Sequence, residues 1–125
     1  MVALDASALI AFLFREPGHE RVAARLDAAC ISSVNLVEVL FRLHREGVDI
    51  DDSYREIARL QIEEVAFEPR DVKVVAGLIA ETRPAGLSLG DCACLALAKA
   101  RGIPAVTADR AWAKLDVGVE IELIR

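Results

Sequence analysis

Four acidic residues could form a metal site although they come from separate segments of the chain. Each lies just after an expected strand or in the first two turns of an expected helix: Asp5, Glu38, Asp91 and Asp109. In a parallel α/β sheet such positions meet at one edge, where ligands bind. Two unit charges roughly 4 Å apart cost about 4 kcal/mol at an effective dielectric of about 20, so clustered carboxylates require a cation. Because every ligand is an oxygen, we expect Mg²⁺ or Mn²⁺.

The predicted metal ligands are Asp5, Asp91 and Asp109. Asp5 ranks first because it leaves the central strand with the least freedom to move, and Glu38 is expected to bind through water or to orient the nucleophile. A metal ion held there would lower the pKa of a bound water molecule and so supply a nucleophile. The hydroxyls of two further residues are expected to hydrogen-bond a carboxylate or a metal-bound water: Ser7 and Thr107. Without a His or Cys base beside either hydroxyl, the sequence does not favour covalent catalysis.

Each acid also has a purely structural explanation. These are helix caps at Asp5 and Asp109, a capping box from Ser88 to Asp91, and an i,i+4 pair between Glu38 and Arg42. Asp5 and Asp91, however, lie inside apolar runs, where an unpaired carboxylate is costly. The four acids taken together therefore favour a functional site.

Short apolar runs alternate with longer helical patterns, which is typical of βαβ units around a parallel sheet. We expect strands over residues 2–4, 29–31, 64–67, 104–107 and 119–123. We expect helices over 7–14, 19–28, 34–46, 51–61, 69–82 and 88–102, with a short one from 110. No internal repeat or linker interrupts this pattern, so residues 1–125 are expected to form a single domain.

Composition limits the class of protein further. The 125 residues are 54% apolar, and three cysteines are too few for a disulfide framework, so we expect a reducing, cytoplasmic location. No apolar run approaches the ~20 residues of a membrane span, and no signal peptide is visible. The net charge of −5 taken alone argues against nucleic-acid binding. Four acids gathered around a metal ion would account for most of that excess.

Four segments resemble, in order and spacing, the signature segments of PIN-domain nucleases: VALDAS (2–7), SSVNLVE (32–38), LSLGD (87–91) and VTAD (106–109). The resemblance covers essentially the whole chain, whose short form is similar to VapC-type toxins of toxin–antitoxin pairs. It implies a three-layer α/β/α fold with a five-stranded parallel sheet in the order 3-2-1-4-5. It also implies a Mg²⁺- or Mn²⁺-dependent endoribonuclease, a homodimer, and a VapB-like antitoxin that inserts a segment into the site. The family's four acids match Asp5, Glu38, Asp91 and Asp109, and its hydroxyl positions match Ser7 and Thr107.

Basic and apolar side chains suggest contacts with other molecules. Arginines that could steer an RNA backbone are Arg15, Arg42 and Arg110, with Arg45 and Lys114 as further candidates. Several large apolar residues exceed the needs of a small core and are expected on partner surfaces: Phe12, Phe14, Leu36, Leu40, Leu43 and Trp112.

Three other functions fit parts of the pattern. A phosphatase with an aspartyl nucleophile would need an acid where Ser7 stands, and a phospho-receiver domain would need an aspartate at Glu68-Pro69. The stronger alternative is a non-catalytic PIN-scaffold module whose acidic pocket docks a basic partner peptide.

Overall fold

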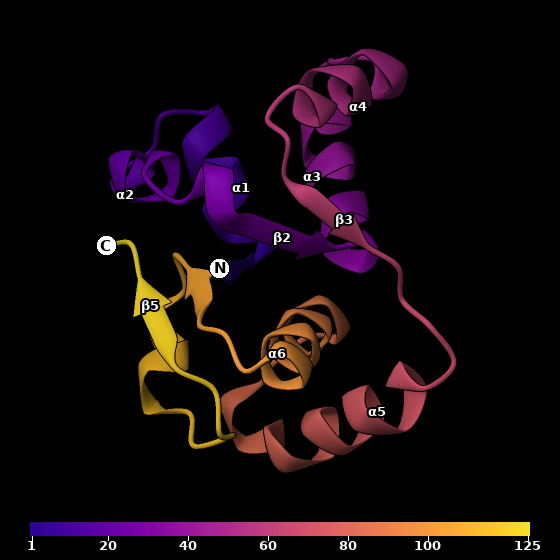
Figure 1. Cartoon of the computed structure of the whole chain (residues 1–125), viewed down its shortest axis with the longest axis vertical. Helices are drawn as coiled ribbons and strands as arrows, with labels where there is room; N and C mark the ends of the chain where they lie inside the picture. The colour runs from indigo at the N-terminus through magenta and orange to yellow at the C-terminus, as the bar shows by residue number, and fades with distance from the viewer.

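The computed structural model describes residues 1–125, and five parallel strands form its centre (Figure 1). They are β1 (Val2–Leu4), β2 (Ala29–Ser32), β3 (Glu63–Val65), β4 (Ala105–Thr107) and β5 (Ile121–Leu123). The order is β3-β2-β1-β4-β5, and every neighbouring pair is parallel. The predicted fold class and strand order are therefore confirmed.

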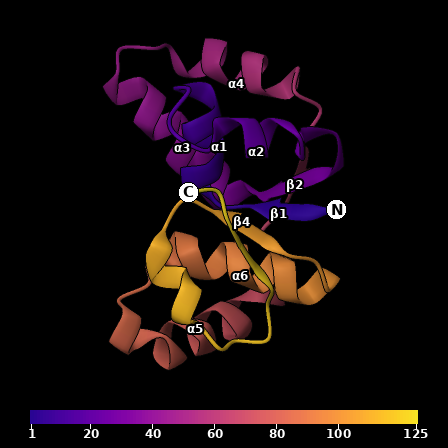
Figure 2. The same cartoon turned by 90° about the vertical axis from the view of Figure 1, so that its left-hand side faces the viewer.

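Helices cover both faces of this sheet. They are α1 (Ala6–Leu13), α2 (His19–Ala23), α3 (Ser33–Arg45), α4 (Ile50–Ala58), α5 (Asp71–Glu81) and α6 (Leu89–Arg101), with the 3₁₀ turns η1 (Leu26–Ala28), η2 (Arg83–Ala85) and η3 (Arg110–Lys114). Figures 1 and 2 show α5 and α6 on one face, and α1 to α4 on the other. The helix expected over 19–28 is shorter than predicted, because its last part tightens into η1 before β2 begins. No helix combines the length and the apolar character needed to span a membrane.

The alternation of side chains along β1 joins the two layers of the core. Val2 and Leu4 pack with residues of α1 and α2, whereas Ala3 packs with residues of α5 and α6. All three residues are buried, as expected for a parallel strand covered on both faces. The central strand is thereby fixed from both sides, and so is Asp5, the residue that follows it.

The prediction that six large apolar residues lie on partner surfaces is wrong for Leu36 and Trp112. Trp112 is fully buried in the core beside α5 and α6, and Leu36 packs against α1 and α4. Phe12, Leu40 and Leu43 are half-buried against the core, and of the six only Phe14 is exposed. Positions 36, 39, 40 and 43 of α3 share one helical face, so the same periodicity turns Val37 and Phe41 towards solvent.

Candidate active site

A cavity of about 490 Å³ lies at the carboxyl edge of the sheet, and all four predicted acids line it. Asp5 follows β1 and Asp109 follows β4, while Glu38 belongs to α3 and Asp91 to the first turn of α6. Parallel strands end, and the following helices begin, at the same edge. The structure thus brings together side chains that are up to 104 residues apart in the sequence, Asp5 and Asp109.

Asp5 is buried, and two hydroxyl groups hold its carboxylate. The hydroxyls of Ser7 and Thr107 donate to Asp5 Oδ2 at 2.6 and 2.9 Å. Both hydroxyls also accept backbone N–H bonds, from Ala108 at 3.0 Å and from Asp109 at 3.1 Å. The side chain of Asp5 makes no hydrogen bond that caps α1, so the capping explanation does not account for it. These contacts lock the carboxylate between β1 and β4.

Burial raises the pKa of Asp5 above its ordinary value, and the nearby charge of Asp91 raises it further. The hydrogen bonds from Ser7 and Thr107 oppose this rise without cancelling it. No basic side chain forms an ion pair with Asp5. The ionised form of this carboxylate is therefore left without a compensating positive charge.

Glu38 is held by two residues that the sequence analysis did not single out. Asn35 is fully buried and donates from Nδ2 to Glu38 Oε2 at 3.3 Å and to the carbonyl of Gly90 at 2.9 Å. A Cβ at Gly90 would lie 2.0 Å from Glu38 Oε1, so only glycine leaves room for the carboxylate there. Burial raises the pKa of Glu38, and the charges of Asp5 and Asp91 raise it further, against the hydrogen bond from Asn35. The i,i+4 pair with Arg42, which was the purely structural alternative for Glu38, does not form, because Arg42 pairs with Glu16 and Glu46 instead.

Asp91 and Asp109 line the cavity and also serve the structural roles considered from the sequence. Asp91 Oδ2 accepts the N–H of Ser88 at 2.9 Å, and Ser88 Oγ accepts the N–H of Asp91 at 3.1 Å, which completes a capping box. Asp109 Oδ1 accepts the N–H of Ala111 at 2.9 Å at the start of η3. Each carboxylate uses one oxygen in its cap, and a cap role does not exclude a role in the cavity.

The chemistry of these donors fits a hard divalent cation. All are carboxylate oxygens, the pKa values of Asp5 and Glu38 are raised by burial and by neighbouring acids, and no arginine or lysine forms an ion pair with any of the four. No three acidic, His or Cys side chains stand close enough to enclose an ion by themselves. Mg²⁺ keeps several of its waters and is usually held by one or two carboxylates, so it does not need such an enclosure.

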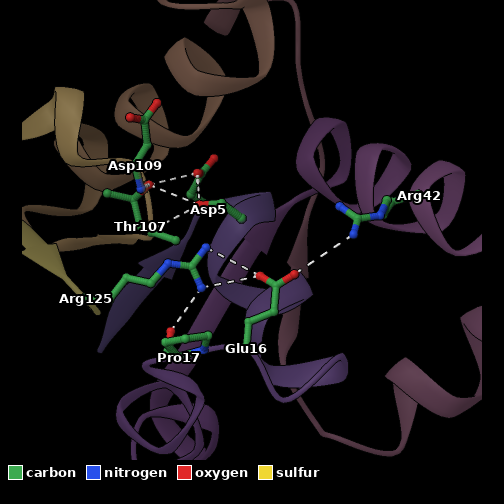
Figure 3. A network of polar contacts seen from close by, with 9 residues as sticks. Asp5, Glu16, Pro17, Arg42, Thr107, Asp109 and Arg125 are labelled. Atoms are coloured by element: carbon green, nitrogen blue, oxygen red, sulfur yellow. Dashed lines mark hydrogen bonds and ion pairs between the residues drawn. The ribbon is translucent and has the colours of Figure 1, made fainter.

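Arginines line the mouth of the same cavity. Of the three arginines proposed from the sequence to steer RNA, only Arg42 lines it; Arg15 does not, and Arg110 donates to the carbonyl of Arg125 at 3.3 Å. Arg45 also lines the cavity, as do two residues that the sequence analysis missed, Glu16 and Arg125. Figure 3 shows Glu16 between the guanidinium groups of Arg42 and Arg125.

The model of the PIN domain family matches residues 2–118, which include the four central acids, the strands β1 to β4 and all six helices, while β5 and Arg125 lie beyond the match. The chain belongs to the PIN domain family. The match to the sequence includes all four acids of this PIN domain and both hydroxyl residues that hold Asp5. It therefore agrees with the family resemblance seen in the four sequence segments.

Solved structures similar to this PIN domain include toxin–antitoxin proteins. VapBC2 from Rickettsia felis, bound to a promoter DNA fragment, has a TM-score of 0.72 at 15% identity, with 98% of each chain covered. DNA-bound VapBC from Salmonella typhimurium has a TM-score of 0.71 at 19% identity, covering 99% of this chain and 98% of that one. VapC20 from Mycobacterium tuberculosis, a Sarcin-Ricin loop cleaving toxin, has a TM-score of 0.68 at 12% identity, covering 96% and 99%. At these identities the similarity shows a shared fold. No curated protein sequence matches the chain.

Proposed function

We propose that this PIN domain, over residues 1–125, is an endoribonuclease that depends on Mg²⁺ or Mn²⁺ and acts as the toxin of a toxin–antitoxin pair. The observation that carries this proposal is the set of four carboxylates in one cavity, none of which forms an ion pair with a basic side chain. The negative charges of these carboxylates repel one another, and a bound cation would relieve that repulsion. Membership of the PIN family supports phosphodiester hydrolysis as the use of that cation.

The position of each residue in the cavity suggests its role. Asp5, Asp91 and Asp109 would hold the ion, in part through its bound waters, since no three acids stand close enough to enclose it directly. Asp5 is the most firmly placed because of its two hydroxyl donors. Glu38, placed by Asn35, would orient the attacking water. When bound, the ion activates that water and neutralises charge on the phosphodiester. Ser7 and Thr107 both donate to Asp5, so they act as supports rather than as nucleophiles.

Cleavage of cellular RNA tests the proposal directly. Purified protein incubated with total RNA should produce new ends, with 5′-phosphate and 3′-hydroxyl groups, in Mg²⁺ or Mn²⁺ but not in EDTA. Asp5→Asn keeps the size of the side chain and should lower cleavage more than about a hundredfold, because loss of a mere supporting partner already costs about 10- to 100-fold. Circular dichroism should show that the variant is folded. Equal cleavage by the variant and the wild type would contradict the assignment.

The alternative, a non-catalytic module that docks a basic peptide in the acidic cavity, predicts no metal effect. A cation that binds only the folded state stabilises it by RT ln(1 + [L]/Kd), about 2.7 kcal/mol at a hundred times Kd. For a domain of this size we expect a rise of roughly 10 °C in Tm with Mn²⁺. If Mn²⁺ left Tm unchanged and the protein did not cleave RNA, the docking module would be favoured.

The toxin role rests on the shared fold with VapBC proteins and therefore needs its own test. We expect expression of the wild type to arrest bacterial growth, and a cognate VapB-like antitoxin to relieve the arrest. Asp5→Asn is the matched control because it should remove toxicity without removing the fold. A homodimer is part of the same proposal, and sedimentation of the purified protein checks it.

A further inference from the structure

Glu16 joins two arginines from distant parts of the chain at the mouth of the acid cavity (Figure 3). Arg125 donates to Glu16 Oε1 from Nη1 at 3.4 Å and from Nη2 at 3.5 Å, and to the carbonyl of Pro17 at 3.0 Å. Arg42 Nη2 lies 4.0 Å from Glu16 Oε2. The three charged side chains are each about one third exposed, so they are accessible from solvent.

The arginines at this mouth are only partly paired: Arg42 and Arg125 share Glu16, Arg42 also pairs with Glu46 at 3.4 Å, and Arg45, which lines the same cavity, forms no ion pair. The two arginines offer about ten N–H donors, and a carboxylate offers about four acceptor sites. The distances to Glu16 are also long for charge-assisted bonds, which are typically about 2.7–2.9 Å. Arg101 and Glu63, by contrast, form a closed pair at 2.7 and 2.8 Å. Three arginines thus face two carboxylates, so one positive charge and several donors remain at the mouth of the cavity.

Both arginines are held in place before any ligand arrives. Arg42 donates from Nε to Glu46 at 3.4 Å, and its guanidinium lies 5.1 Å from the centre of the Phe14 ring. Arg125 is tied to Glu16 and to the carbonyl of Pro17. Because long side chains lose rotamer freedom when they bind, arginines that are already restrained bind an anion at a lower entropic cost.

We propose that Arg42 and Arg125 form a subsite for one phosphate of the RNA strand, next to the phosphate that is cut. The proposal rests on the nuclease function proposed above. A phosphodiester carries one negative charge, which matches the positive charge left when Arg42, Arg45 and Arg125 are set against Glu16 and Glu46. The acids of the same cavity repel an anion unless a cation is bound there. With the cation in place, the scissile phosphate would lie at the acids and a flanking phosphate at the arginines.

The test uses a short RNA that spans a mapped cleavage site, and the full-length protein with Mg²⁺. Arg42→Ala and Arg125→Ala should each raise KM about tenfold with little change in kcat, because this contact is made equally in the ground state and the transition state. The slope of log affinity against log salt should fall by about 0.7 for each lost phosphate contact. The lysine variants at the same positions keep the charge and should recover part of the affinity.

Arg59→Ala is the matched control, since it removes the same charge from an exposed position just after the end of α4, outside the cavity. A second measurement replaces single phosphates of the RNA by neutral methylphosphonates. Replacing one particular phosphate should weaken binding to the wild type, and it should weaken binding to Arg125→Ala less, because only Arg42 still contacts that phosphate in the variant.

Two results would overturn the subsite. One is a KM for the arginine variants equal to that of Arg59→Ala, and the other is the absence of any single sensitive phosphate. Failure of the nuclease proposal looks different, because the wild type itself would then not cleave the RNA in Mg²⁺.

Discussion

Carboxylates at two places on the sheet have opposite electrostatic surroundings. On the edge strand β3, Glu63 forms two hydrogen bonds with Arg101, at 2.8 and 2.7 Å, and these lower its pKa. At the end of the central strand β1, Asp5 has no ion pair, and burial raises its pKa. The edge acid is neutralised by the protein's own cation, whereas the central acid is not. This difference is the reason why we propose an external cation at the central acids and none at the edge strand.

The neighbours of each acid strengthen this contrast. Glu64, also on β3, accepts hydrogen bonds from Tyr54 at 2.6 Å and from Ser33 at 2.8 Å, and both lower its pKa. Glu38 receives one hydrogen bond from Asn35, but burial and the charges of Asp5 and Asp91 raise its pKa. The β3 acids are stabilised by their surroundings, while the cavity acids destabilise one another.

The largest difference between the two places should appear in activity. Glu38→Gln removes a cavity carboxylate and should reduce metal-dependent RNA cleavage more than about a hundredfold, with unchanged or higher stability without metal, because repulsion is relieved. Glu63→Gln breaks the edge pair and should leave cleavage unchanged while lowering Tm slightly. Initial cleavage rates and thermal melts in EDTA measure both. If the two variants lost activity equally, the distinction between the two groups of acids would be wrong.

The fold was predictable because its determinants are local. Short buried apolar runs predict the central strands, and Ser88 predicts the start of α6. Strand β3 was expected at 64–67 but covers Glu63–Val65, because long-range partners such as Arg101 stabilise its acids. Contacts between residues far apart in the sequence also explain which residues of the site the sequence analysis missed. Glu16 and Arg125 are 109 residues apart, and no spacing in the sequence shows that they meet.

Asn35 is a different case, because a signal was present in the sequence. It lies three residues before Glu38, a spacing that places both side chains on one face of α3. Its amide could therefore have been proposed as a partner of Glu38. That it also binds the carbonyl of Gly90 depends on the packing of α3 against α6, which the sequence does not show.

A smaller effect should follow from moving Glu38 rather than removing it. Gly90→Ala places a methyl group where Glu38 Oε1 lies, and the flexible glutamate can move aside without unfolding the protein. We expect cleavage to fall about tenfold, as for the loss of a supporting contact. Gly77→Ala in α5 is the matched control, because its new Cβ meets nothing within 4 Å. The control should keep full activity and gain about 0.5–1 kcal/mol of helix stability. Full activity of both variants would show that the position of Glu38 is unimportant.

The smallest effect is the pH dependence of stability without metal. Its direction should differ between the cavity acids and the acids of β3. An acid whose pKa is raised by folding binds more protons in the native than in the unfolded state, so stability falls as pH rises through the interval above its ordinary value. For Asp5 and Glu38 that interval begins at 3.8 and 4.5. In EDTA, acidification from pH 7 should therefore raise the contribution of the cavity acids to stability. Glu63 and Glu64 act in the opposite direction, and only below 4.5, where their lowered pKa values lie.

The difference in unfolding free energy between the wild type and Asp5→Asn isolates the cavity from other titrating groups. In EDTA the variant should be the more stable protein at pH 7, and its advantage should shrink as pH falls towards the ordinary pKa of aspartate. With saturating Mn²⁺ the wild type should instead become more stable as pH rises, because the bound cation requires ionised carboxylates and protons compete with it. Urea titrations at several pH values measure both trends. A difference that is independent of pH in EDTA would mean that Asp5 is compensated within the fold as Glu63 is, and the cavity would then need no cation.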